Sequence, residues 1–306
     1  MLDLNNFLLR GFYKLFNRSK YKNYKNLLQI KNDQKLFKVK FEKYINQIQD
    51  NLNNKKEISF LHSGHTGDII NILPILKNLS KTHKCKLYIQ LDSPISKFYP
   101  HHPAGQVFMN KKIYDMLLPL LKKQQYLDSI ETYNKQNIDI NFDIIRELPI
   151  RLTFDSMKYG FHISGIQADL NETFLSVDEH LTIKNKIIIL RSLRYQNHFI
   201  NYDFLSKYED VYFIGTINEY DDLKKNINNL RFYNCKDFLD MAQIIKSCKL
   251  FIGNSSMGFT IAEGLKVPRL LEAYPWNGSQ QVHGFNGYDF YFQSHFEKFF
   301  QILHNK

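Results

Sequence analysis

Three short segments place polar side chains and glycines where a ligand could be bound or activated. The segment GHTGD (residues 64–68) puts two glycines and one carboxylate between a short apolar run and a helical apolar pattern. The segment GNSSM (residues 253–257) puts cap-type side chains before another helical pattern, and LRSLR (residues 190–194) puts two arginines after a third apolar run. By itself, the first segment is compatible with a connecting turn and equally with part of an active site.

The second and third segments together predict a diphosphate site. Asn254, Ser255 and Ser256 would cap the following helix, whose exposed N–H groups and positive dipole favour an anion. The forked guanidiniums of Arg191 and Arg194 suit phosphate oxygens. Each signal has an ordinary alternative, because capped helix starts occur in every α/β protein and surface arginines pair with nearby carboxylates. Their combination at strand ends favours the diphosphate.

Short apolar runs alternate with helix-length segments from residue 58 onward. The predicted strands are residues 58–62, 86–91, 186–190, 211–215, 230–234, 249–253 and 268–272. Repeated strand–helix units of this kind predict an α/β protein with parallel, doubly wound sheets. A junction near residues 176–185 divides them into two Rossmann-like domains that face a cleft. Ligands of such sheets bind outside the carboxyl ends of the strands, so we expect the three polar segments to meet there.

The domain boundaries follow from this pattern. The predicted parts are a basic amphipathic helical extension (1–55), an N-terminal domain (56–178), a C-terminal domain (179–288) and a C-terminal helix packing back towards the N-terminal domain (289–306). In the N-terminal domain a helix is predicted from residue 68 to about residue 81, with Pro74 bending its first turns.

The positive charge of the chain is concentrated near its start. Residues 1–50 contribute +7 of the formal net charge of +11, from eleven Lys or Arg against four Asp or Glu. Apolar residues at helical spacing between positions 7 and 16 are flanked by these cations, as in a helix lying on an anionic inner-leaflet membrane. A helix packed on the protein body with a solvated basic face fits the same pattern. No nucleic-acid-binding motif accompanies the basic residues, so nucleic acid is not an expected partner.

Composition and spacing limit the remaining classes of protein. No apolar run of about eighteen residues and no signal-type segment occurs, and Cys85, Cys235 and Cys248 share no metal-ligand spacing. We therefore expect a reduced, cytoplasmic protein. The scattered histidines and carboxylates predict no metal site. The turn after residues 186–190 lacks the G-x-G-x-x-G pattern of dinucleotide-dependent oxidoreductases.

Two of the segments also resemble motifs of a known family. GDIINILP (residues 67–74) is similar to the N-terminal signature of the family 9 glycosyltransferases, the ADP-heptose lipopolysaccharide heptosyltransferases and their relatives, in which five residues separate a Gly-Asp pair from a Pro. GNSSMGFTIAEGLKVP (residues 253–268) is similar without gaps to the family's GNDSGPMHLAAALGVP. The resemblance spans about residues 58–290. It implies the GT-B fold, a nucleotide-diphosphate-sugar donor, no metal or other cofactor, and inversion at the anomeric carbon.

The resemblance also implies roles for individual residues. Asp68 matches the general base that deprotonates the acceptor hydroxyl, a role that suits a carboxylate at the cleft mouth. Arg194 matches a basic residue that neutralises the departing diphosphate in place of a metal. Glu219 matches an acidic residue that accepts from the ribose hydroxyls. The implied donor-binding residues are Arg191, Arg194, Gly215, Glu219, Asn254, Ser255, Ser256 and Met257. The implied acceptor-side residues are Gly64, His65, Thr66 and Gly67.

The chain departs from the family pattern inside the phosphate loop. The family's Asp, Gly and His are replaced by Ser255, Met257 and Thr260, and a glycine turn is replaced by Arg191 and Ser192. We therefore expect a divergent glycosyltransferase whose sugar is heptose or another. Its acceptor would be a lipid-linked or oligosaccharide hydroxyl of a lipopolysaccharide-core-like glycan, reached at the membrane through the basic extension. A GT-B sugar-nucleotide epimerase and a non-catalytic nucleotide- or glycan-binding relative are the alternatives.

Overall fold

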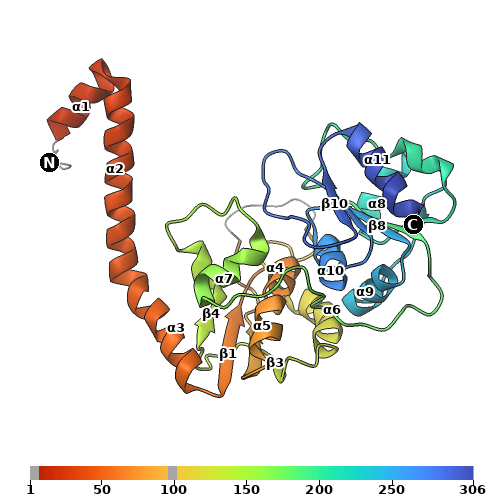
Figure 1. The fold of residues 1–306 in the computed structure, drawn as a ribbon, viewed down its shortest axis with the longest axis horizontal. Coiled ribbons are helices and arrows are strands. Elements are labelled where there is room, and N and C mark those ends of the chain that lie inside the picture. Colours follow the sequence, from red (N-terminus) through yellow and green to blue (C-terminus); the bar gives the residue numbers. More distant parts are fainter. Residues whose placement is uncertain (1–6, 96–101, 306) are drawn as a thin grey trace.

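The structure, a computed structural model, describes residues 7–95 and 102–305, except for the side chains of Phe7 and Leu8. It contains a helical arm and two α/β domains, each built on a parallel sheet (Figure 1). This architecture confirms the predicted fold class. The first six residues of the predicted extension lie outside the described residues.

The first domain is built on four parallel strands in the order β3-β2-β1-β4. The strands are β1 (Glu57–His62), β2 (Lys84–Ile89), β3 (Ser129–Thr132) and β4 (Ile140–Asn141). Phe60 of β1 is fully buried and lies level with Leu87 on β2 and Ile140 on β4. Because both faces of this central strand are covered, it reads as a continuous apolar run in the sequence.

The helix predicted over residues 68–81 is divided in two. α4 (Thr66–Asn71) and α5 (Leu73–Leu79) are separated by Ile72, which caps the end of the first helix and the start of the second. Pro74 lies in the first turn of α5. A proline in a first turn removes no intrahelical hydrogen bond, so the chain redirects at this point instead of bending one helix. The domain also contains α6 (Lys111–Lys122), α7 (Tyr159–Ser164), η2 (Phe142–Arg146) and η3 (Ser156–Lys158).

The second domain is built on six parallel strands in the order β10-β9-β8-β5-β6-β7. The strands are β5 (Ile187–Leu190), β6 (Val211–Phe213), β7 (Arg231–Phe232), β8 (Leu250–Asn254), β9 (Arg269–Glu272) and β10 (Gly287–Phe290). The intervening helices are η4 (Asp203–Lys207), α8 (Ile217–Lys224), α9 (Phe238–Lys246) and α10 (Met257–Leu265). Five of these strands were predicted, and β10 was not.

The C-terminal helix, α11 (Gln293–His304), packs on the second domain. Its Phe296, Phe300 and Leu303 are buried in a cluster of second-domain side chains. The rings of Phe296 and Phe290 stack with their centroids 4.2 Å apart. The expectation that residues 289–306 pack back towards the N-terminal domain is therefore wrong, because this aromatic stripe covers the sheet that the helix directly follows.

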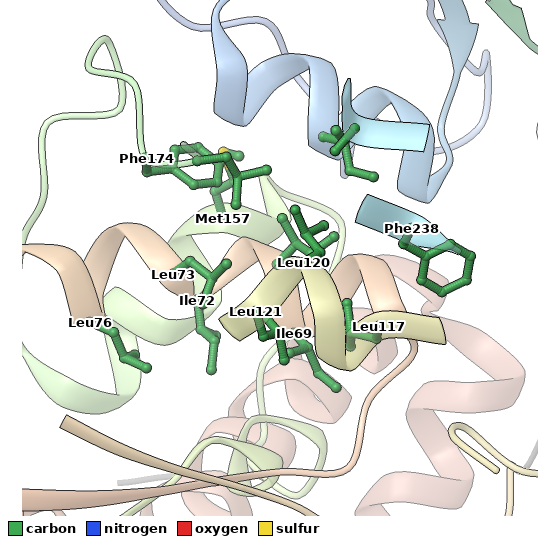
Figure 2. Close-up of a cluster of buried hydrophobic side chains, with 14 of the residues drawn as sticks. Ile69, Ile72, Leu73, Leu76, Leu117, Leu120, Leu121, Met157, Phe174 and Phe238 are labelled. Atoms are coloured by element: carbon green, nitrogen blue, oxygen red, sulfur yellow. The ribbon is translucent and has the colours of Figure 1, made fainter. Parts of the chain in front are cut away.

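One apolar core joins the two domains. Leu117 and Leu120 of α6 are fully buried and belong to the same cluster as Ile69 of α4 and Phe238 of α9 (Figure 2). α6 packs against α9, and α4 packs against α10. The domains therefore meet through interlocked side chains as well as through the connecting chain.

The arm extends away from the first domain (Figure 1). It consists of α1 (Phe7–Phe16), α2 (Arg18–Leu36), a π-helical stretch η1 (Phe37–Phe41) and α3 (Glu42–Asn54). α3 joins the domain, where Ile48 is fully buried and Gln49 donates to the carbonyl of Ser164 at 2.8 Å. α1 and α2 pack on each other at the far end. Within the described part of the chain, no helix has the length and apolar character needed to span a membrane.

Candidate functional site

The structure brings the predicted acceptor-side segment into contact with the predicted phosphate loop. α4 follows β1 and α10 follows β8, each at the carboxyl edge of its sheet. A methyl group on Gly67 would lie 3.7 Å from Met257 Cα and 3.7 Å from Thr260 Oγ1. The two helix starts therefore pack closely, and a ligand bound beside their contact would touch both domains.

Asp68 lies in the first turn of α4 and is partly buried. Its Oδ2 accepts a hydrogen bond from the backbone N–H of His65 at 3.0 Å, which caps the helix. Among the described residues, none donates to its Oδ1. Gly64 leaves the space for this carboxylate, because a methyl group there would lie 2.6 Å from Asp68 Cβ. One oxygen thus stabilises the helix start, and the other is able to accept a proton.

Two uncharged imidazoles lie near Asp68. The rings of His65 and His102 have their centroids 4.5 Å apart, and His65 Nδ1 lies 2.9 Å from the carbonyl oxygen of Phe108. Burial lowers the pKa of His65; the charge of Asp68 opposes this effect and that of Arg194 adds to it. Burial, His65 and Arg194 together lower the pKa of His102 to about 4. At neutral pH the charge of the site therefore comes from the carboxylate and the arginines.

The loop that leads into α4 is anchored by Asp143 and Arg146. The N–H of Ser63 donates to Asp143 Oδ1 at 2.9 Å, and Arg146 donates to the same oxygen at 2.9 Å and to Ser63 Oγ at 3.0 Å. Burial favours a higher pKa for Asp143, but its hydrogen bond and charge interaction with His62, together with the charge of Arg146, hold that pKa well below its ordinary value. An ionised Asp143 therefore fixes this loop at neutral pH.

Side chains of the second domain act on this first-domain cluster. Arg194 and Tyr195 lie in the loop after β5, with the guanidinium 5.4 Å from the centre of the tyrosine ring. Burial raises the pKa of Tyr159 to about 12, and the charges of Asp68, Asp155 and Tyr195 add to this effect. Arg194 lies within electrostatic range of His65 and His102 of the first domain. Its role in binding a diphosphate stays a prediction.

Arg191 forms an ion pair with a buried carboxylate. Its Nε and one terminal nitrogen donate to the two carboxylate oxygens of Glu272 at 2.6 and 2.8 Å. Glu272 is fully buried and also accepts from the hydroxyl of Tyr202 at 2.8 Å. Two of its three guanidinium nitrogens are thus engaged by this buried carboxylate, and the contact of Arg191 with the donor stays a prediction.

Asn254 and Ser256 shape the loop before α10. The side chain of Asn254 is fully buried, with Oδ1 accepting from Ser192 N at 2.8 Å and Nδ2 donating to Ser192 O at 2.7 Å. Both ends of this amide are used to join the loops after β5 and β8, so Asn254 shapes the predicted phosphate loop, and its contact with the donor stays a prediction. Ser256 caps α10 by accepting from the N–H of Phe259.

The first turn of α10 retains donors for an anion. Within the described part of the chain, the N–H groups of Met257 and Gly258 have no acceptor. The N–H of Ser256, in contrast, donates to Oε1 of Gln280 at 2.9 Å. Ser255 lies just before this turn and Met257 begins it. The predicted phosphate loop therefore has the position and the backbone donors that anion binding requires.

Glu219 and Gly215 lie at the start of α8, after β6. Glu219 Oε2 accepts from the N–H of Thr216 at 3.0 Å and caps the helix. A methyl group on Gly215 would lie 2.7 Å from the same oxygen, so this glycine makes room for the carboxylate. The contact of Glu219 with a ribose stays a prediction.

Metal and thiol chemistry have no support in the arrangement of the side chains. No group of three or more His, Cys, Asp or Glu among the described residues could hold a metal ion. Burial raises the pKa values of Cys85 and Cys235 to about 12, so these thiols are protonated at neutral pH and are weak nucleophiles.

Several side chains of this site were not predicted. His102, Arg146, Tyr159 and Gln280 come from segments without a recognisable pattern, and only the tertiary fold brings them near the starts of α4 and α10. Tyr195 could have been found, because it directly follows Arg194 in a strand-end loop.

No family model and no curated protein matches the sequence. Solved structures match its fold. The family 9 glycosyltransferase from Veillonella parvula DSM 2008 superposes with a TM-score of 0.52 at 11% identity, over 81% of this chain and 89% of that chain. The E. coli heptosyltransferase WaaC, solved with ADP, superposes with a TM-score of 0.56 at 8% identity, over 81% of this chain and 99% of that chain. The chain therefore has the two-domain fold of these glycosyltransferases.

Proposed function

We propose that this protein is a glycosyltransferase that moves a sugar from a nucleotide-diphosphate donor to a hydroxyl of a cell-envelope glycan. One observation supports this reading most strongly. Gly67, the residue before Asp68, lies against the start of α10 across the two domains, in a fold shared with a heptosyltransferase solved with ADP. A proton acceptor and an anion site are thus close enough to act on one substrate.

The reaction would follow from the positions of these groups. The acceptor hydroxyl gives its proton to Asp68 Oδ1 while its oxygen attacks the anomeric carbon of the donor sugar. The bond between that carbon and the donor phosphate oxygen breaks, and the nucleotide diphosphate leaves with the electron pair. Attack from the side opposite the leaving group inverts the anomeric centre.

The departing diphosphate would be stabilised by the second domain. Arg194 supplies a positive charge, and the N–H groups of Met257 and Gly258 supply hydrogen bonds at the positive end of α10. We propose that these groups act in place of a metal ion. Methionine stands at position 257 where the family pattern has glycine, and we propose that the donor sugar is heptose or another.

Substitution of Asp68 tests the assignment. After a thermal-shift screen of nucleotide-diphosphate sugars has identified a donor, Asp68→Asn should lower transfer by about 10² or more while donor binding persists. Asp240→Asn is the matched control, because Asp240 also caps a helix start, by accepting from Lys236 N at 2.9 Å, away from the cleft. Unchanged transfer by Asp68→Asn would exclude this base.

The same assay separates the alternative functions. Interconversion of the donor sugar without an acceptor would favour a sugar-nucleotide epimerase. Donor binding without turnover by the wild type would favour a non-catalytic relative.

We also propose that α1 holds the protein on the cytoplasmic, anionic face of a membrane. α1 and α2 stand away from both domains (Figure 1), and Phe12, Leu15 and Phe16 are 56%, 78% and 73% exposed. Residues 7–41 carry ten Lys or Arg against one Asp. An exposed apolar stripe within a strongly basic arm fits an anionic lipid surface. It also disfavours the alternative in which this part of the extension packs on the protein body.

Flotation with anionic vesicles tests the docking. Replacing Phe12, Leu15 and Phe16 together by Ser should abolish flotation, whereas the same substitutions at Leu27 and Val39, exposed on the rest of the arm, should not. Equal flotation by the first variant would contradict the role of α1. Deleting residues 1–50 is unsuitable, because it removes Ile48 from the core of the first domain.

A further inference from the structure

The loop between β9 and β10, residues 273–286, reaches the start of α10 through Gln280. The Oε1 of Gln280 accepts from Ser256 N at 2.9 Å, and its Nε2 lies 2.7 Å from Thr260 Oγ1 and 3.3 Å from Ser256 O. These partners fix the orientation of the amide, because a backbone N–H only donates and a carbonyl oxygen only accepts. Gln280 therefore covers the first turn of the helix.

This position is one that an anion would need. A phosphate at a helix start accepts hydrogen bonds from the exposed backbone N–H groups. The amide oxygen of Gln280 already accepts from one of them, that of Ser256. A charged phosphate oxygen makes a hydrogen bond roughly twice as strong as a neutral one, so it would replace the amide when it is present.

The same loop is tied to the first domain next to Gln280. The carbonyl of Ser279 accepts from Ser156 N at 2.7 Å, and His283 Nε2 lies 2.8 Å from Asp155 Oδ2. Withdrawal of Gln280 from α10 would therefore disturb contacts on both sides of the cleft.

We infer that the β9–β10 loop is a lid: the Gln280 amide and the donor diphosphate compete for the N–H of Ser256, and the diphosphate displaces the amide when it binds. The inference rests on the diphosphate site of the proposed function. In the structure the lid supplies Ser256 N with an acceptor and bonds to Ser156 of the first domain. Binding of the donor then opens these contacts.

Calorimetric titration with ADP and with inorganic pyrophosphate tests the lid. Gln280→Ala removes the competing amide and should bind both ligands about fivefold more tightly than the wild type, which corresponds to one neutral hydrogen bond. Gln280→Glu holds a negative charge at the same N–H group and should bind both about tenfold more weakly. Gln281→Ala is the matched control, because this neighbouring glutamine is exposed and should bind like the wild type.

Trp276 provides a second measurement. It is the only tryptophan of the chain, lies on the lid, is 69% exposed, and stacks on His198 with ring centroids 5.3 Å apart. ADP should shift the emission of Trp276 in the wild type and in Gln281→Ala. Gln280→Ala should show the shifted emission before ligand is added.

The outcomes separate the lid from the site beneath it. Equal or weaker ADP binding by Gln280→Ala would overturn the lid and leave the diphosphate site in place. ADP binding to the wild type without a change in Trp276 emission would also overturn the lid. Failure of both ligands to bind either the wild type or Gln280→Ala would overturn the diphosphate site, and the lid with it.

Discussion

Gly64 and Gly67 should respond oppositely to the same substitution. A methyl group on Gly64 would lie 2.6 Å from Asp68 Cβ and 2.6 Å from His62 Cε1. The loop and α4 would have to move apart to admit it, and overpacking of this kind costs about 1–3 kcal/mol. We expect Gly64→Ala to lower the free energy of unfolding by about that amount.

At Gly67 the added methyl group fits the protein but not the ligand. Its distances of 3.7 Å to Met257 Cα and to Thr260 Oγ1 are ordinary contacts. Alanine is favoured over glycine inside a helix by about 0.5–1 kcal/mol, so the stability of Gly67→Ala should be unchanged or higher. The methyl group would lie 4.0 Å from Met257 N, where the diphosphate needs to approach. ADP affinity should fall about tenfold or more, because the same overpacking cost applies to the complex.

Urea unfolding and ADP calorimetry on both variants distinguish these effects. Gly11→Ala is the control for Gly67→Ala, because Gly11 also lies in a helix and a methyl group there meets no atom within 4 Å. It should leave ADP binding unchanged. Wild-type ADP affinity in Gly67→Ala would refute the placement of the diphosphate between α4 and α10. An unchanged free energy of unfolding in Gly64→Ala would show that the close approach at Asp68 is relieved without cost.

Three further predictions concern charged side chains. Glu272→Gln should lower the free energy of unfolding by about 3–5 kcal/mol, because it leaves Arg191 buried without its counter-charge, and a loss below about 1 kcal/mol in urea would contradict this. As the pH falls from 6.5 to about 4, the unfolded chain takes up a proton that the folded His102 excludes, so the melting temperature should fall, and His102→Gln should reduce the slope. Arg194→Ala should weaken ADP binding by about 1–2 kcal/mol in calorimetry, the value of a charged hydrogen bond, and unaltered affinity would remove Arg194 from the site.

The sequence identifies the central strands of both sheets and one edge strand, β7, and misses the other three edge strands. β1, β5 and β8 were predicted because strands covered on both faces read as apolar runs. β3, β4 and β10 were not, because they have two to four residues and partly exposed side chains. Their place at or near the sheet edges is decided by pairing with distant strands, which leaves no periodic signal in so short a segment.

The candidate site shows the same division between local and distant causes. The loops at Asp68 and Ser256 were predicted because strand, turn and helix-cap signals all lie within a few residues of each other. Arg191 has the right position for a phosphate ligand, but Glu272, 81 positions away, already binds it. The N–H of Ser256 is likewise bound by Gln280 from another loop. Local sequence shows that a group could bind a ligand, and only the fold shows whether the protein itself has occupied that group.

The core shared by the two domains favours loop movement over domain separation as the way into the site. Pulling α6 from α9 would expose Leu117, Leu120 and Phe238, which are at most 7% exposed in the structure (Figure 2). Exposing one such side chain fully costs about 1.5–3 kcal/mol, so the three together would cost about 5–9 kcal/mol. Lifting the β9–β10 loop breaks a few hydrogen bonds, each with a net value of about 1 kcal/mol, and the ligand or water replaces them. A ligand shifts a conformational equilibrium only by the difference between its affinities for the two conformations, so the movement that costs less free energy is favoured. We therefore expect the donor to enter by displacing this loop.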